Sequence, residues 1–235
     1  GNVTGNFTWL FDDVKLVTVA GGLSQMNLPV TFDDPTVNYG LVGFGGAEQS
    51  TIVTDPTLAT NKVAKVIKTN TAELWAGTTI TALLGSSQTS FANNIPFTAG
   101  ATRMNVRVWS PHTGIQVRLK VEDKNDPTKS CETEATFSGA ANTWQTLEFN
   151  FANQAAGTAA LNLAFNFNKA SIFFNFGVTG ATAGERIYYF DDMKFGAIPP
   201  PPAPVVVSPV NYCQNAVAAA LTATATSGNT LVWYT

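Results

Sequence analysis

Strict alternation of apolar and polar residues is the feature that most constrains this chain. Apolar side chains occupy every second position of residues 103–109 and again of residues 116–122. In a strand, residues two apart lie on one face, so this pattern predicts half-buried strands. Residues 155–163 are the one helical candidate, and Gly157 and Thr158 argue against a helix there. Roughly ten short strands between residues 28 and 196, separated by Gly, Pro and Asn, predict an all-β sandwich or barrel.

A seven-residue phrase occurs twice, far apart in the chain. Residues 10–16 read Leu-Phe-Asp-Asp-Val-Lys-Leu, and residues 189–195 read Tyr-Phe-Asp-Asp-Met-Lys-Phe. The first copy stands too early to close a complete domain, whereas the second ends a long β-rich stretch. Self-similarity at long period is typical of tandem arrays. We therefore expect residues 1–22 to be the C-terminal end of a preceding β-sandwich module and residues 23–197 to be a complete module of the same kind.

The C-terminal part of the chain changes in style. Residues 199–204 read Pro-Pro-Pro-Pro-Ala-Pro, which predicts a semi-rigid linker over residues 198–204. Residues 205–235 contain Cys213 and Trp233 and resemble the N-terminal part of an immunoglobulin-like domain. Cys131 and Cys213 fall in different predicted modules, so we do not expect them to pair with each other. We expect a buried thiol at Cys131 and a partner for Cys213 beyond the C-terminus.

Composition restricts the partners of the chain. Charged residues make up 12% of the sequence, about half the usual share of a soluble domain, and the net charge is −3. No basic run is present, which argues against nucleic acid as a partner. No apolar run approaches the roughly 20 residues of a membrane helix, which argues against membrane insertion. The profile is typical of an extracellular all-β protein, so we expect the chain to be secreted or at the cell surface.

The phrases at both ends of the β-rich stretch resemble those of a known family. Residues 28–34 (Leu-Pro-Val-Thr-Phe-Asp-Asp) and 188–194 (Tyr-Tyr-Phe-Asp-Asp-Met-Lys) resemble the bracketing motifs of jelly-roll carbohydrate-binding modules. Residues 106–111, 117–123 and 143–149 are similar to the interior of such modules in large secreted Bacteroidota proteins. Residues 212–215 (Tyr-Cys-Gln-Asn) resemble the immunoglobulin-like repeats of those proteins. The resemblance implies a jelly-roll β-sandwich, export by the type IX secretion system, and neighbouring modules and secretion-system components as partners.

The resemblance also implies a structural calcium ion (Ca2+). In the related modules an early carboxylate and an aspartate of the last strand hold calcium together with backbone carbonyls. Asp33 or Asp34 matches the early position, and Asp191 or Asp192 matches the late one. Calcium takes six to eight oxygen ligands and tolerates loop geometry. Adjacent strand residues face opposite sides, so one aspartate of each pair could reach a shared ion. The alternative is that these aspartates are solvated or cap a turn.

Sugar recognition needs aromatic rings for the apolar sugar faces and polar side chains for the hydroxyls. Trp109 is the first candidate, because it lies on the polar phase of its strand together with Arg107. Trp75 is the second, and Arg118 and Glu132 belong to two polar rows on neighbouring strands. The alternative is that the tryptophans lie in the core and that the rows form cross-strand ion pairs.

Catalysis is the rival hypothesis. Glu132 and Glu134 have the one-residue spacing that two carboxylates on one strand face would need. Arg118 and Lys120 are expected opposite them, which would keep both ionised and leave no general acid. The single histidine, His112, has no matching Ser or Cys constellation. The sequence therefore predicts a non-catalytic module.

The predicted function is binding of a polysaccharide or surface glycan, or adhesion, in a long repetitive protein. A purely structural spacer and an accessory module of a polysaccharide hydrolase remain as alternatives. Exposed tryptophans on one concave face would favour binding, whereas burial of Trp75 and Trp109 would favour the spacer.

Overall fold

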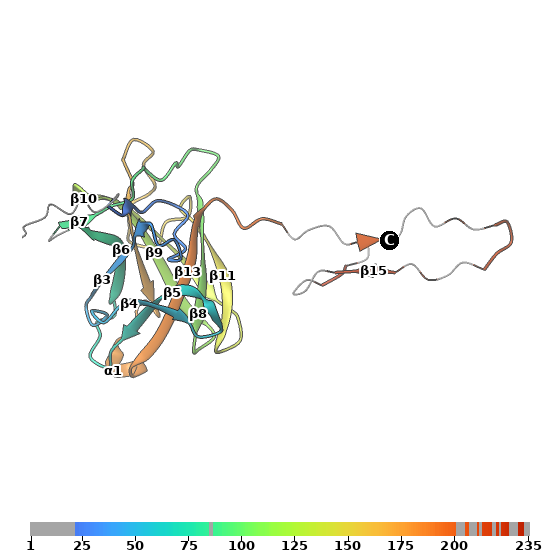
Figure 1. The fold of residues 1–235 in the computed structure, drawn as a ribbon, viewed down its shortest axis with the longest axis horizontal. Helices are drawn as coiled ribbons and strands as arrows, with labels where there is room; N and C mark the ends of the chain where they lie inside the picture. Colours follow the sequence, from blue (N-terminus) through green and yellow to red (C-terminus); the bar gives the residue numbers. More distant parts are fainter. Residues whose placement is uncertain are drawn as a thin grey trace, which may run out of the picture.

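The computed structural model describes residues 22–84 and 87–200, and beyond them residues 205–206, 211, 213–217, 220, 222–225 and 230–232. The predicted preceding module, residues 1–22, lies outside this part except for its last residue. No helix in the described residues is long and apolar enough to cross a bilayer. The four-residue helix α1 (Gly180–Ala183) lies at one end of a body built from strands (Figure 1).

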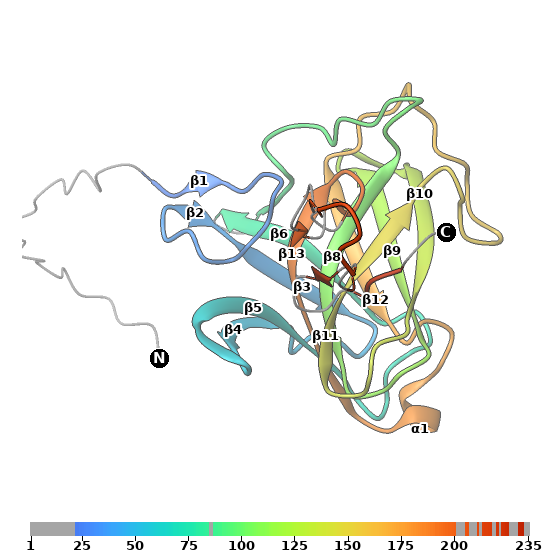
Figure 2. The same cartoon turned by 90° about the vertical axis from the view of Figure 1, so that its right-hand side faces the viewer.

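Two antiparallel sheets form the body, and Figures 1 and 2 show them as two layers. The six-stranded sheet has the order β10 (Asp126–Phe137), β9 (Ile115–Asp123), β12 (Lys169–Phe174), β6 (Gly77–Leu84) and β3 (Gly40–Phe44), with β7 (Ser87–Thr89) also paired to β6. The five-stranded sheet has the order β11 (Thr143–Asn150), β8 (Arg103–Ser110), β13 (Arg186–Phe195), β5 (Leu58–Lys68) and β4 (Thr51–Asp55). The short strands β1 (Ser24–Gln25) and β2 (Val37–Asn38) pair in parallel. The predicted all-β jelly-roll sandwich is thereby confirmed.

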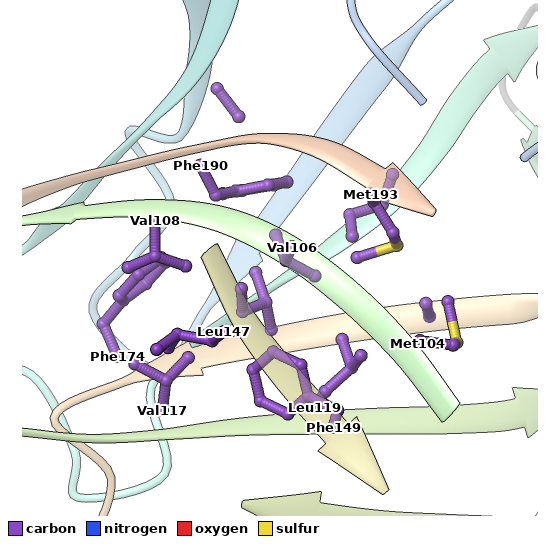
Figure 3. Close-up of a cluster of buried hydrophobic side chains, with 14 of the residues drawn as sticks. Met104, Val106, Val108, Val117, Leu119, Leu147, Phe149, Phe174, Phe190 and Met193 are labelled. Carbon is purple, nitrogen blue, oxygen red and sulfur yellow. The ribbon is translucent and has the colours of Figure 1, made fainter. Parts of the chain in front are cut away.

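Apolar side chains from both sheets fill the space between them. The alternation predicted in β8 and β9 is confirmed, since Val106, Val108, Val117 and Leu119 are all fully buried. Figure 3 shows these side chains meeting others from β11, β12 and β13 in one cluster. Each such side chain stabilises the fold by about 1.5–3 kcal/mol through removal from water.

A β-bulge interrupts the last strand of the sandwich, β13. Asp191 pairs with Arg107 and Lys194 pairs with Asn105, so β13 has one residue more than β8 over this stretch. Asp192 takes up the extra length with a φ of 51°. Asp191, which precedes the bulge, faces Arg107 on the outer face of the sheet. The bulge turns Met193 into the core, where it is fully buried.

Two sequence predictions have different outcomes at the edges of the sandwich. Residues 28–34 open the stretch in which short strands were predicted, but the prediction of a strand there is wrong, because Val30 makes only an isolated bridge, to Met193. Pro29 lacks a backbone donor and Phe32 has a φ of 61°, so an extended ladder cannot continue there. The expectation of a buried thiol at Cys131 is confirmed.

The predicted immunoglobulin-like start stays a prediction. Its described residues include the two-residue strands β14 (Val205–Val206) and β15 (Ala223–Thr224), which pair antiparallel. Trp233 lies outside the described residues, and Cys213 is exposed and free.

Candidate functional site

A groove of about 560 Å³ lies on the outer face of the six-stranded sheet. It crosses the strands, because its lining side chains come from β3, β6, β12, β9 and β10 and from the loops beside them. On β9 these are the residues that alternate with the core positions, such as Arg118 and Lys120. The polar phase of β9, read from the sequence, thus forms part of the groove floor.

Four aromatic side chains form one end of the groove. Trp75 is 47% exposed and stacks on Phe44, with ring centroids 6.2 Å apart and an interplanar angle of 21°. Phe44 meets Phe173 edge to face at 5.7 Å, and Phe173 meets Phe176 in the same way at 5.9 Å. The rings therefore make a continuous apolar platform on which the C–H face of a sugar ring can stack.

The loop that carries Trp75 is held by backbone hydrogen bonds to the turn after β3. The amide of Glu73 donates to the carbonyl of Gly45 at 2.8 Å, and the amide of Thr69 donates to that of Gly46 at 3.0 Å. The Trp75 ring lies directly over Gly45, where a Cβ atom would stand 2.7 Å from Cζ3 of the indole. Glycine at this position thus makes room for the ring.

Charged side chains line the rest of the groove, beside the aromatic rings. Arg118 donates to Glu132 at 2.9 Å and to Glu134 at 2.6 Å, and its guanidinium lies 3.5 Å over the Phe176 ring. The ammonium groups of Lys120 and Lys169 bind the two oxygens of Glu122 at 2.7 and 2.6 Å. Glu134 does not line the groove itself but binds Arg118, so the five charged lining side chains and Glu134 together carry three positive and three negative charges.

Glu122 is ionised in spite of its burial. Burial by itself raises the pKa of this carboxyl, but hydrogen bonds and charge from Lys120 and Lys169 outweigh that effect and lower the pKa. Glu132 and Glu134, the pair considered for catalysis, both bind Arg118, as the sequence predicted. The arrangement leaves no carboxylate of this pair free of a basic neighbour.

The structure divides the predicted sugar-binding residues between two faces. Trp75, Arg118 and Glu132 line the groove. Trp109 and Arg107 lie on the outer face of the other sheet, so they cannot complete the same site. There Trp109 packs edge to face on Tyr189 at 5.3 Å.

Sequence reasoning missed several residues of the groove. Phe173 lies on the outward phase of β12, and Phe44 lies on the outward phase of β3. An apolar ring on the outward phase is the signal that could have found both. Phe176 and Lys169 gave no such signal, because their place in the groove depends on how distant strands pair.

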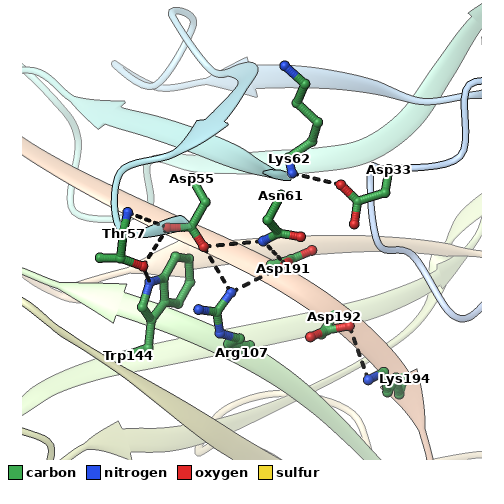
Figure 4. A network of polar contacts seen from close by, with 10 residues as sticks. All are labelled: Asp33, Asp55, Thr57, Asn61, Lys62, Arg107, Trp144, Asp191, Asp192 and Lys194. Carbon is green, nitrogen blue, oxygen red and sulfur yellow. Dashed lines mark hydrogen bonds and ion pairs between the residues drawn. The ribbon is translucent and has the colours of Figure 1, made fainter. Parts of the chain in front are cut away.

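A buried polar cluster lies under the hairpin of β4 and β5, on the outer face of the five-stranded sheet (Figure 4). Asn61 Nδ2 donates to Oδ2 of both Asp55 and Asp191, at 3.2 and 2.9 Å. Arg107 lies between the same two oxygens at 3.1 and 3.5 Å, and its guanidinium stacks 3.8 Å over the Trp144 ring. One guanidinium therefore serves two carboxylates that are almost completely buried.

The two carboxyls of this cluster differ in pKa. Burial raises the pKa of Asp191 to about 6, with the Asn61 hydrogen bond acting in the opposite direction. Burial also acts to raise the pKa of Asp55, but hydrogen bonds from Thr57, Asn61 and Arg107 outweigh it and lower the pKa to about 2. Oδ1 of Asp191 is buried and has no hydrogen-bond partner among the residues that the structure describes.

The four aspartates predicted to hold calcium are engaged separately. Asp33 accepts a hydrogen bond from the amide of Lys62 at 2.7 Å, Asp34 accepts two from Thr36, and Asp192 pairs with Lys194 at 3.0 Å. Within the described residues, no three His, Cys, Asp or Glu side chains gather as metal ligands. Oδ1 of Asp191 alone is far short of the six to eight oxygens that calcium takes.

Comparison with known proteins finds similar folds among solved structures, whereas comparison by sequence finds no match. No protein-family profile and no curated protein matches this chain. It is similar to a family 11 carbohydrate-binding module of the cellulosomal cellulase Lic26A-Cel5E of Clostridium thermocellum, at 14% identity and a TM-score of 0.45, over 74% of this chain and 97% of that one. It is also similar to a family 30 module of the C. thermocellum cellulosomal cellulase Cel9D-Cel44B, at 9% identity and a TM-score of 0.40, over 72% and 92% of the two chains.

Proposed function

We propose that this chain is a non-catalytic glycan-binding module that holds a polysaccharide in the groove of the six-stranded sheet. The observation that carries the proposal is the exposed Trp75 ring in a groove that also presents lysine and glutamate side chains. A sugar ring can stack on the aromatic platform while its neighbours donate to carboxylates and accept from ammonium groups. Because the charges of the groove balance one another, an uncharged polysaccharide fits it best.

Two tryptophan variants test this proposal. Trp75→Ala removes the exposed end of the platform, whereas Trp109→Ala removes a ring from the opposite sheet. Affinity electrophoresis against a panel of neutral and acidic polysaccharides should show retardation of the wild type and of Trp109→Ala, and little or none of Trp75→Ala. Thermal unfolding of both variants checks that they are folded. Loss of binding in Trp109→Ala alone would show that the polysaccharide binds to the five-stranded sheet instead. If the wild type is not retarded by any polysaccharide, the spacer alternative is supported.

We propose further that the module works outside the cell, in a secreted or surface-anchored adhesin of many modules. The low charged fraction, the repeated seven-residue phrase and the likeness of its motifs to type IX secreted proteins support this setting. Weak binding by single modules would add up along such an array. Antibody labelling of intact cells compared with lysed cells tests the location, and labelling only after lysis would contradict it.

We also propose that a structural calcium ion binds to the carboxyl group of Asp191. The observation in favour is its buried Oδ1, for which the described part of the chain offers no hydrogen-bond partner. Calcium should then raise the melting temperature of the wild type, and a chelator should reverse this, but neither should affect Asp191→Asn. An equal rise in melting temperature for the wild type and the variant would show that Asp191 does not bind the ion. No change in either protein would show that calcium does not stabilise the fold.

A further inference from the structure

A buried lysine connects the two loops that carry the aromatic platform. Lys68 is the last residue of β5 and is 2% exposed. It follows Ala64 and Val66 on the core-facing phase of the strand, so its side chain points into the end of the sandwich. Its Nζ lies 3.2, 3.1 and 2.8 Å from the backbone carbonyls of Phe174, Asn175 and Val178.

These three carbonyls form a cage that the ammonium group fills. A lysine ammonium has three donors, and each has one acceptor here. The segment turns sharply, with φ of 46° at Asn175 and 83° at Gly177, so its carbonyls leave the regular ladder of β12. Without the ammonium the carbonyl of Asn175 would keep only the long bond from the amide of Val178 at 3.3 Å, and the carbonyls of Phe174 and Val178 would lose a charged donor, which is costly. Burial lowers the pKa of Lys68 to about 8, which reflects the cost of keeping the charge there.

Both ends of this connection lead to the groove. Residues 174–178 include Phe176, whose ring lines the groove and lies over Arg118. On the other side, Lys68 leads directly into the loop that carries Trp75. The amide of Gly177 donates to the carbonyl of Leu74 at 3.0 Å, and the amide of Gly180 donates to that of Ala72 at 2.7 Å. The two loops thus share backbone bonds next to the lysine cage.

We infer that Lys68 is a positioning residue for glycan binding, which locks the Trp75 loop and the Phe176 loop into one platform. It does not line the groove and acts only through the loops. This inference rests on the proposed function for its affinity readout, but the ordering of the loops can be measured without any ligand.

The experiment compares three variants of the full chain. Lys68→Met removes the ammonium and keeps an apolar stem, and Lys68→Arg retains a charged donor. The matched control is Lys65→Met, the same change on the outward phase of the same strand. Amide hydrogen exchange should become about tenfold faster at residues 69–76 and 174–179 in Lys68→Met, because buried carbonyls have lost their donor. Exchange in β8 and β9 should not change, and Lys65→Met should match the wild type.

Affinity for the polysaccharide that the wild type retains gives the second readout. Lys68→Met should weaken binding by about tenfold, Lys68→Arg should recover part of it, and adding Phe176→Ala to Lys68→Met should cost little more, because both act on one unit. Unchanged loop exchange in Lys68→Met would overturn the inference, and so would full additivity with Phe176→Ala. If the wild type retains no polysaccharide, the proposed function fails, and the exchange result still decides the role of Lys68.

If Lys68→Met does not fold, the pH dependence of polysaccharide binding by the wild type tests the inference instead. Its affinity should fall as pH rises through about 8, the pKa of Lys68, whereas Phe176→Ala should show no such step. Two other groups of β13 lie beside Lys68. Tyr188 stacks on Phe174, and burial raises its pKa to about 12, so it keeps its proton over this range. Arg186 is the register partner of Lys68 and donates to His112 Nε2 at 2.6 Å. Arginine keeps its charge over this range, so Arg186 would not cause the step. A wild-type profile without a step would overturn the inference.

Discussion

At the scale of single residues, the position of Trp75 depends on a glycine. Gly45 has a φ of 67°, a conformation that side-chain-bearing residues rarely adopt, and the Trp75 ring covers its Cα. Gly114 has a similar φ of 76°, but a Cβ atom there would meet nothing within 4 Å. Alanine substitutions at these two glycines can therefore distinguish the effect of backbone strain from the effect of displacing the Trp75 ring.

We predict that Gly45→Ala weakens polysaccharide binding by about tenfold, whereas Gly114→Ala leaves it unchanged. Both changes should destabilise the fold by roughly 1 kcal/mol, because both place alanine at a positive φ. Affinity electrophoresis and urea unfolding of the two variants provide the measurements. Equal affinity in both variants would show that the ring does not depend on Gly45.

Asp191 gives the protein a pH dependence of stability. The pKa of its carboxyl is about 6 in the folded protein and about 3.8 when exposed, so the unfolded chain ionises first. Its contribution is fully present below pH 3.8 and is lost as pH rises to 6. The loss amounts to about 3 kcal/mol for a shift of this size. The lowered pKa of Asp55 acts in the opposite direction, but only below pH 3.8.

The free energy of unfolding of the wild type should therefore fall more steeply between about pH 4 and pH 6 than that of Asp191→Asn. Urea unfolding at several pH values measures the difference in slope. Asp126→Asn is the control, because Asp126 is a carboxyl at the protein surface that is hydrogen-bonded to Thr128. Parallel curves for wild type and Asp191→Asn would contradict the assignment.

At the scale of elements, the hairpin of β4 and β5 folds across its own sheet. β4 and β11 are the two edge strands, yet Thr57, in the turn after β4, accepts a hydrogen bond from Trp144 Nε1 of β11 at 3.0 Å. Asp55 stabilises this turn by accepting from both the amide and the hydroxyl of Thr57. The hairpin thereby covers Arg107 and Asp191, which explains their burial on an outer face.

Trp144→Phe should destabilise the protein by about 1 kcal/mol, because it keeps a ring over Arg107 and removes the donor to Thr57. Trp109→Phe is the matched control, since Trp109 is the register partner of Trp144 on the neighbouring strand. Chemical unfolding monitored by circular dichroism measures both. Adding Thr57→Val removes the hydroxyl bond to Asp55 in both backgrounds, so it should cost stability in both, but about 1 kcal/mol more in Trp109→Phe, where the bond from Trp144 is also lost. Equal costs in the two backgrounds would exclude the coupling.

At the scale of the whole molecule, one core and one groove belong to the same stretch of chain. The buried cluster runs from Met26 to Met193, and the groove is lined by residues between Val42 and Phe176. The predicted module of residues 23–197 thus contains both. The bond from the amide of Ile198 to Glu148 is one described contact that a cut at residue 197 would remove.

A chain of residues 23–197 should accordingly keep its fold and its ligand. We expect its melting temperature to stay within about 3 °C of the full chain, which corresponds to about 1 kcal/mol for a domain of this size. Its affinity for polysaccharide should be unchanged. A large loss of stability would show that residues outside this range support the sandwich.

The sequence by itself determined the class of fold, the phase of its clearest strands and the residue types of the polar rows. Period-two alternation is a local property, so it placed Val117 in the core and Arg118 on the surface without knowledge of any partner strand. It also placed Arg118 opposite Glu134 through the hairpin of β9 and β10, which are consecutive in the chain.

Only the tertiary structure decided which surfaces those residues share. Trp75 and Trp109 both read as surface candidates, but the pairing of strands far apart in sequence puts them on opposite faces of the sandwich. Lys68 meets carbonyls more than a hundred residues away, and Asn61 meets Asp191 across 130. Such contacts follow from the packing of the sheets and loops, and local sequence patterns carry no information about them.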